Sequence, residues 1–96
     1  MDFKIRLTET ALTDFEEVVG WSWENHEDTS ERFARSLLNH LRLLEGLPFL
    51  GVPVRGYPGI RKLLHSPLHI YYRVDEERSA IEILHFWHVK RKAPRL

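Results

Sequence analysis

Apolar and charged residues alternate at the start of the chain and then give way to helical spacing. Residues 3–7 alternate apolar with charged side chains, which predicts a half-buried strand. Thr8 follows with a hydroxyl that can cap a helix. Apolar side chains then recur at intervals of three and four, at Leu12, Phe15, Val19 and Trp23. This spacing predicts a helix that extends to about Asn25 and buries those four side chains.

A second apolar stripe follows the polar segment 25–29. Its members recur at helical spacing and are Phe33, Leu37, Leu41 and Leu44. Leu38 would widen this buried face, and Gly46 and Pro48 would end the helix. Because the connection between the two helices is short, we expect them to form an antiparallel hairpin.

The C-terminal half has the pattern of three strands behind a Gly- and Pro-rich loop over residues 49–58. The strands are predicted at 59–65, 68–74 and 80–88, with a polar hairpin loop at 75–79. The last strand is apolar on both faces along residues 81–84, which is typical of a central strand. The predicted fold class is α+β, in the order β-α-α-β-β-β. An N-terminal strand and an antiparallel helical hairpin precede a three-stranded antiparallel meander, and the helices cover one face of the sheet.

Length and composition fit one domain over residues 1–96. The chain has 96 residues and no cysteine, so disulfides and thiolate metal sites are excluded. No signal-peptide core or membrane span is evident, and we expect a cytoplasmic protein. Residues 1–50 hold five Lys/Arg and ten Asp/Glu, and residues 51–96 hold nine and four, although the net charge is zero. The basic half can face a polyanion or an acidic partner, or the two layers simply attract each other.

Three stretches of the C-terminal half share the order and spacing of a known family. They are residues 59–63, 70–75 and 81–91, and Ala11, Asp14 and Phe15 fit the same pattern earlier in the chain. With them the chain resembles the RelE/ParE superfamily of toxins from type II toxin–antitoxin systems over nearly its whole length. The resemblance implies a growth inhibitor that a cognate antitoxin neutralises in a hetero-oligomer. The implied target is DNA gyrase for a ParE-like toxin, or the ribosome with its mRNA for an endonuclease of the RelE kind.

Metal-independent RNA cleavage needs a base for the 2′-hydroxyl, cations for the phosphate and an acid for the leaving oxygen. His88 is the candidate for proton transfer and Arg73 for a two-oxygen phosphate clamp. Further candidates for binding phosphate or target are Arg61, Lys62, Arg91 and Tyr71. The tail 89–96 has no Tyr or His, although nucleases of the family usually place a proton-transfer group near there. This difference favours gyrase slightly as the target.

Purely structural roles are open for the same residues. Arg73 can pair with Glu82 across the hairpin, and His88 can simply end a strand. We expect no cofactor and no metal, because no pair of histidines has the His-Glu-x-x-His arrangement. The resemblance also implies an antitoxin groove, for which the candidates are Trp21, Phe49 and Trp87. A non-toxic binding module that keeps the fold is the remaining alternative.

Overall fold

Seven helices and strands make up the fold of this computed structural model. It describes residues 2–25 and 27–96, and it describes side chains at all of these positions except 21–29. The elements are β1 (Lys4–Leu7), α1 (Glu9–Asn25), α2 (Glu27–Gly46), β2 (Val52–Pro53), β3 (Ile60–His65), β4 (Leu68–Asp75) and β5 (Ala80–His88). The predicted order is confirmed, with β2 added inside the segment that the sequence predicted to be a loop. None of the described helices is long and apolar enough to cross a membrane.

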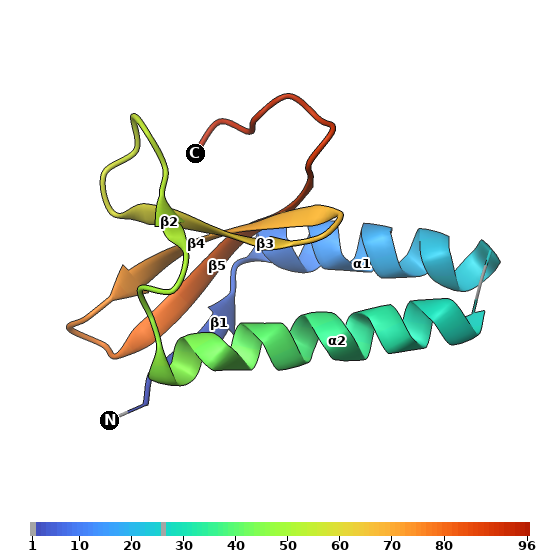
Figure 1. Ribbon diagram of the computed structural model, residues 1–96, viewed down its shortest axis with the longest axis horizontal. Coiled ribbons are helices and arrows are strands. Elements are labelled where there is room, and N and C mark those ends of the chain that lie inside the picture. The colour runs from blue at the N-terminus through green and yellow to red at the C-terminus, as the bar shows by residue number, and fades with distance from the viewer. Residues whose placement is uncertain (1, 26) are drawn as a thin grey trace.

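The sheet has five strands in the order β1-β5-β4-β3-β2. β3, β4 and β5 form the predicted antiparallel meander, while β1 runs parallel to β5 and completes a mixed sheet. β5 therefore lies between two strands, as its apolar pattern predicted. The two helices lie side by side against one face of the sheet (Figure 1).

Thr8 fixes how α1 begins. Its hydroxyl oxygen accepts a hydrogen bond from the backbone N–H of Ala11 at 3.2 Å, which confirms the predicted cap, and it donates to the carbonyl of Ile83 at 2.8 Å. The helix is thereby attached to β5 at its first turn. The buried stripe of α1 consists of Ala11, Phe15 and Val18. The predicted stripe was therefore wrong in part, because attachment at Thr8 turns Leu12 outward and leaves it 48% exposed.

α2 follows its predicted pattern closely. Leu37, Leu41 and Leu44 are almost fully buried, and Phe33 packs against the same core. Leu38 does not widen this face, since 44% of it is exposed. The buried face of α2 is therefore narrower than predicted and is centred on Leu37, Leu41 and Leu44.

A β-bulge interrupts the pairing of β4 with β5. Arg73 pairs with Glu82, but Tyr71 pairs with His85, so Leu84 is an extra residue in β5. An extra residue reverses which face each later side chain occupies. Side chains of β5 before and after the bulge consequently follow opposite alternation along the strand.

Gly51 lies against the buried ring of Tyr72 on the helix side of the sheet. The Tyr72 hydroxyl accepts a hydrogen bond from the Gly51 backbone N–H at 2.8 Å. A Cβ atom at residue 51 would lie 2.7 Å from the Lys62 carbonyl oxygen and 2.7 Å from the Tyr72 ring. Only glycine fits here, and this close approach fixes the segment before β2 onto the sheet.

Candidate functional site

The sheet face opposite the helices carries most of the polar and aromatic side chains of the meander. The register places Lys62, Tyr71 and His85 in one row across β3, β4 and β5. On the same face, His69 and Trp87 form the row on one side of these three residues. Arg73 and Glu82 form the row on the opposite side of them. We call this surface the open face. Its polar and aromatic members are Lys62, His69, Tyr71, Arg73, Glu82, His85 and Trp87, and Leu64 lies beside His69 on the same face.

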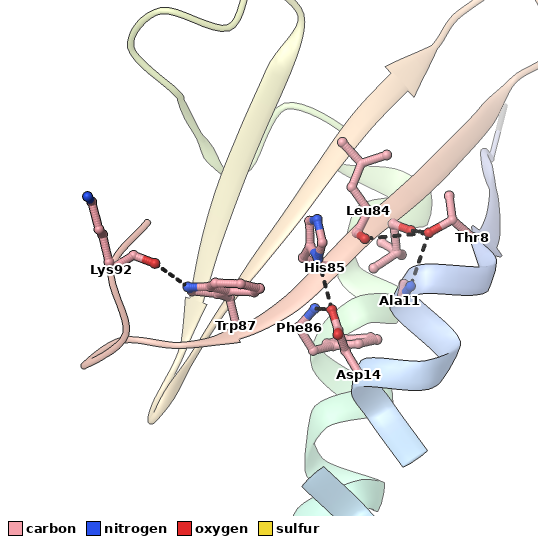
Figure 2. A network of polar contacts seen from close by, with 9 residues as sticks. Thr8, Ala11, Asp14, Leu84, His85, Phe86, Trp87 and Lys92 are labelled. Carbon is pink, nitrogen blue, oxygen red and sulfur yellow. Dashed lines mark hydrogen bonds and ion pairs between the residues drawn. The ribbon is translucent and has the colours of Figure 1, made fainter. Parts of the chain in front are cut away.

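Asp14 of α1 holds His85 at the edge of the open face (Figure 2). One carboxylate oxygen of Asp14 lies 2.9 Å from His85 Nδ1 and also accepts the backbone N–H of Phe86 at 3.2 Å. This contact is possible because β1 ends at Leu7, opposite Ile83, and leaves the edge of β5 unpaired beyond that point. α1 takes the place of β1 along this edge.

The Asp14 contact favours one tautomer of the neutral His85 ring. A carboxylate at Nδ1 favours the tautomer that carries its proton there, so that Nε2 is free to accept a proton. Both side chains are largely buried, at 17% and 15% exposed, which keeps the pair in a partly dry environment. The arrangement can position a base or a hydrogen-bond acceptor at the open face.

This pair was missed as a site by the sequence interpretation. Asp14 entered it only as part of the family resemblance, and His85 was not among the candidate site residues. The available signal was a carboxylate at residue 14, between the buried positions Ala11 and Phe15 of the same helix.

Three aromatic side chains, His69, Tyr71 and Trp87, lie beside His85 on the open face. Tyr71 is 4% exposed, and its burial raises the pKa of its hydroxyl. Burial and then the charge of Lys62 lower the pKa of His69, which favours its neutral form. The His69 ring meets Tyr71 with centroids 6.2 Å apart, and His85 meets Trp87 at 5.3 Å. Tyr71 is thus enclosed by its surroundings and does not present a free ring for stacking.

The C-terminal tail engages Trp87. The indole N–H donates to the carbonyl of Lys92 at 2.9 Å (Figure 2), and the guanidinium carbon of Arg91 lies 3.8 Å from the centre of the indole ring. Two of the predicted site residues, Trp87 and Arg91, are therefore brought together. Their contact is intramolecular and holds the tail against the end of β5.

Arg73 and His88 are not brought together. Arg73 lies on the open face and forms an ion pair with Glu82 at 2.9 Å, the structural alternative considered above. His88 pairs with Leu68 and so points to the helix side, where its Nδ1 accepts the backbone N–H of Lys90 at 3.1 Å. Strict alternation along β5 would have put the two on one face, and the bulge at Leu84 separates them.

Arg61 is also separated from the other predicted phosphate-binding residues. It pairs with Tyr72 and therefore points to the helix side, whereas its neighbour Lys62 is on the open face. Its guanidinium donates to the Gly51 carbonyl at 2.8 Å and lies 5.0 Å from the centre of the Phe49 ring. Arg61 and Phe49 thus share one surface at the β2 edge of the sheet. The side chain of Trp21 lies outside the described residues.

Among the residues described, no group of three or more His, Asp or Glu side chains is placed to hold a metal ion. The side chains of the open face that can bind an anion or transfer a proton are Lys62, His69, Arg73 and the His85–Asp14 pair. Of the predicted catalytic pair, Arg73 lies on this face and His88 does not.

Comparison with known proteins places this fold among toxins. The sequence model of a family described as the ParE toxin of type II toxin–antitoxin system, parDE, matches residues 5–93. No curated protein sequence matches the chain.

Three solved structures share the fold at low sequence identity. The chromosomal ParDE system from P. aeruginosa has a TM-score of 0.76 and 17% identity, covering 92% of this chain and 97% of that one. The RelBE2 toxin–antitoxin complex from Mycobacterium tuberculosis has a TM-score of 0.69 and 21% identity, covering 92% and 99%. The isolated E. coli RelE toxin has a TM-score of 0.62 and 17% identity, covering 94% and 87%. Both kinds of toxin named here thus have the architecture of this chain.

Proposed function

Because the chain belongs to the ParE toxin family of type II toxin–antitoxin systems, we propose that it stops bacterial growth by binding DNA gyrase, and that a cognate antitoxin neutralises it. The observation that carries the choice of target is the separation of Arg73 from His88 on opposite faces of the sheet. A nuclease that used this pair would need both groups at one phosphate. A toxin that acts by binding does not need them together.

The test is controlled expression in a bacterial host without the antitoxin. We expect cells to filament and DNA breaks to accumulate while protein synthesis continues. The Arg73→Ala and His88→Ala variants should both remain toxic, because a toxin that acts by binding gyrase does not need these side chains for a cleavage reaction. Early loss of translation together with cut transcripts would contradict the proposal. Unchanged growth would favour the non-toxic binding module.

The exposed apolar surface after the middle of α2 supports an antitoxin partner. It consists of Leu43, Leu47, Phe49, Leu50 and Val52, each between 42% and 57% exposed. Exposed apolar side chains of this size are costly in water, and such surfaces commonly receive an amphipathic helix or an added strand. We infer that an antitoxin segment covers this surface.

Leu47 provides a test of the antitoxin surface. Leu47→Asp should weaken co-purification with a co-expressed small protein encoded next to the toxin gene. Leu64→Asp is the matched control, because Leu64 is equally exposed at 57% but lies on the open face. Equal loss of binding in both variants would argue against the assignment of this surface.

The His85–Asp14 pair supports one second candidate, RNA cleavage. In this alternative His85 Nε2 removes the proton of a 2′-hydroxyl, whose oxygen attacks the adjacent phosphorus while Lys62 neutralises the phosphate. The bond from phosphorus to the 5′-oxygen breaks, and this oxygen takes a proton from solvent water, giving a 2′,3′-cyclic phosphate and a 5′-hydroxyl end. His85→Ala should then abolish transcript cleavage and His69→Ala should not. Persistent toxicity of His85→Ala would exclude this mechanism.

A further inference from the structure

Two histidines from different layers face each other at a distance from the open face. His40 of α2 and His65 at the end of β3 have their Nδ1 atoms 2.7 Å apart. Their ring centres are 4.9 Å apart, and the edge of Phe33 packs against His65 at 5.6 Å. The contact joins the helical layer to the sheet.

Apart from His40, the side chains that pack against His65 are apolar or aromatic. His65 is packed by Phe33 and His40 of α2, and its partner on β4 is the apolar Leu68. In the described part of the chain, each of the two rings makes its hydrogen bond to the other ring. Burial lowers the pKa of His65, and the charge of His40 lowers it further. The ionisable group that acts on His65 is therefore His40 itself.

The number of protons bound to the two imidazole rings decides whether their contact is attractive or repulsive. Two neutral rings can share one proton between their Nδ1 atoms, and a ring with one added proton can still donate to a neutral partner. When both rings carry an added proton, each Nδ1 is a donor and no acceptor remains between them. The two positive charges then also repel each other at close range.

We propose that His40 and His65 form a proton-sensitive clasp that ties α2 to the end of β3 while the pair carries at most one positive charge, and that opens when both rings are charged. The clasp takes no part in the gyrase or RNA chemistry discussed above. It would instead set how firmly the helical layer is held to the sheet as pH changes.

The sign of the effect follows from the direction of the pKa shift. The pKa of His65 is below its ordinary value of 6.5 in the folded protein, so the unfolded chain binds the proton more readily. The stabilising contribution is therefore fully present above about pH 6.5 and is lost as pH falls toward the lowered pKa. Acid should loosen α2 before the central strands are affected.

Imidazole NMR of the full chain tests the coupling directly. In the wild type we expect His65 to titrate below its ordinary pKa of 6.5. In His40→Gln the pKa of His65 should move back toward 6.5, because one of its two causes is removed. His69→Gln is the control and should leave the pKa of His65 unchanged. His69 also has a lowered pKa, but its charged neighbour is Lys62. An identical titration of His65 in the wild type and in His40→Gln would overturn the proposal.

Amide hydrogen exchange tests the opening without depending on the titration. After correction for intrinsic rates, amides of α2 near His40 should exchange faster at pH 5.5 than at pH 7.5 in the wild type, by up to about 10-fold, while amides of β4 and β5 change less. In His65→Gln, exchange in α2 should be nearly independent of pH over this range. The same pH dependence in the variant and the wild type would show that the pair is not a clasp.

Discussion

Replacing Gly51 with alanine should destabilise the fold by roughly 1–3 kcal/mol, although it adds a single methyl group. The new Cβ would lie 2.7 Å from the Lys62 carbonyl oxygen, 2.7 Å from the Tyr72 ring and 2.8 Å from the Tyr72 hydroxyl. Ordinary contacts of a Cβ begin near 3.4 Å. The carbonyl belongs to the sheet ladder and the ring is fully buried, so neither can move aside without disturbing the core.

The protein can respond to the clash in two ways, and each gives this range. Overpacking of a well-filled site costs about 1–3 kcal/mol. If the loop moves away to relieve the clash, the hydrogen bond from the Gly51 N–H to Tyr72 is lost, and an unsatisfied buried hydroxyl or amide costs about 1–3 kcal/mol. For a domain of this size each kcal/mol lowers the melting temperature by roughly 4–8 °C, so a fall on the order of 10 °C is expected.

The assay is urea denaturation of the two variants Gly51→Ala and Gly20→Ala beside the wild type. Gly20 is an exposed residue in α1 with open space around its Cβ position. Alanine there should stabilise the protein by about 0.5–1 kcal/mol, because it favours the helix. The same glycine-to-alanine change should thus lower the free energy of unfolding at residue 51 and raise it at residue 20. A Gly51→Ala variant as stable as the wild type would refute the argument from close approach.

Three other expectations follow from single contacts. Asp14→Ala should lower stability by about 1–3 kcal/mol, since it leaves a backbone N–H of β5 and an imidazole without their acceptor, and Asp14→Asn should recover part of the loss in the same melt. Arg73→Ala should change the free energy of unfolding by no more than about 1 kcal/mol, because its ion pair is half exposed, and a larger loss would mean that the pair is tighter than its exposure indicates. The wild type should lose stability between pH 7 and pH 5 more steeply than His65→Gln, since the lowered pKa of His65 makes the unfolded state the better proton acceptor, and parallel pH profiles would contradict this.

Much of the architecture could be predicted because each element carries its own periodicity. The stripe of α2 and the central position of β5 were evident from spacing and apolar content. The rotation of α1 was not, because it depends on the contact between Thr8 and Ile83, which lie 75 residues apart in the chain. β2 was hidden because its two residues, Val52 and Pro53, lie in a segment whose composition is typical of a loop.

The candidate site was predicted less well than the fold, and the bulge is the physical reason. β5 is apolar on both faces near Leu84, so its sequence contains no signal for where the alternation changes. If strict alternation is assumed along the whole of β5, His88 falls on the same face as Arg73 and His85 falls on the helix side. In the structure the two histidines have the opposite placement. The Asp14 contact depends on where β1 ends, which no property of β5 alone records.

The parallel pairing of β1 with β5 also has a consequence for the order of synthesis. The register partner of Lys4 is Ala80, so the strand that the ribosome makes first must wait for the strand that it makes last. Until then the helical hairpin has no complete sheet to cover, and its apolar stripe is available to other partners. A chain that terminates before residue 80 lacks the strand that both β1 and β4 require, so interrupted translation should yield no folded toxin.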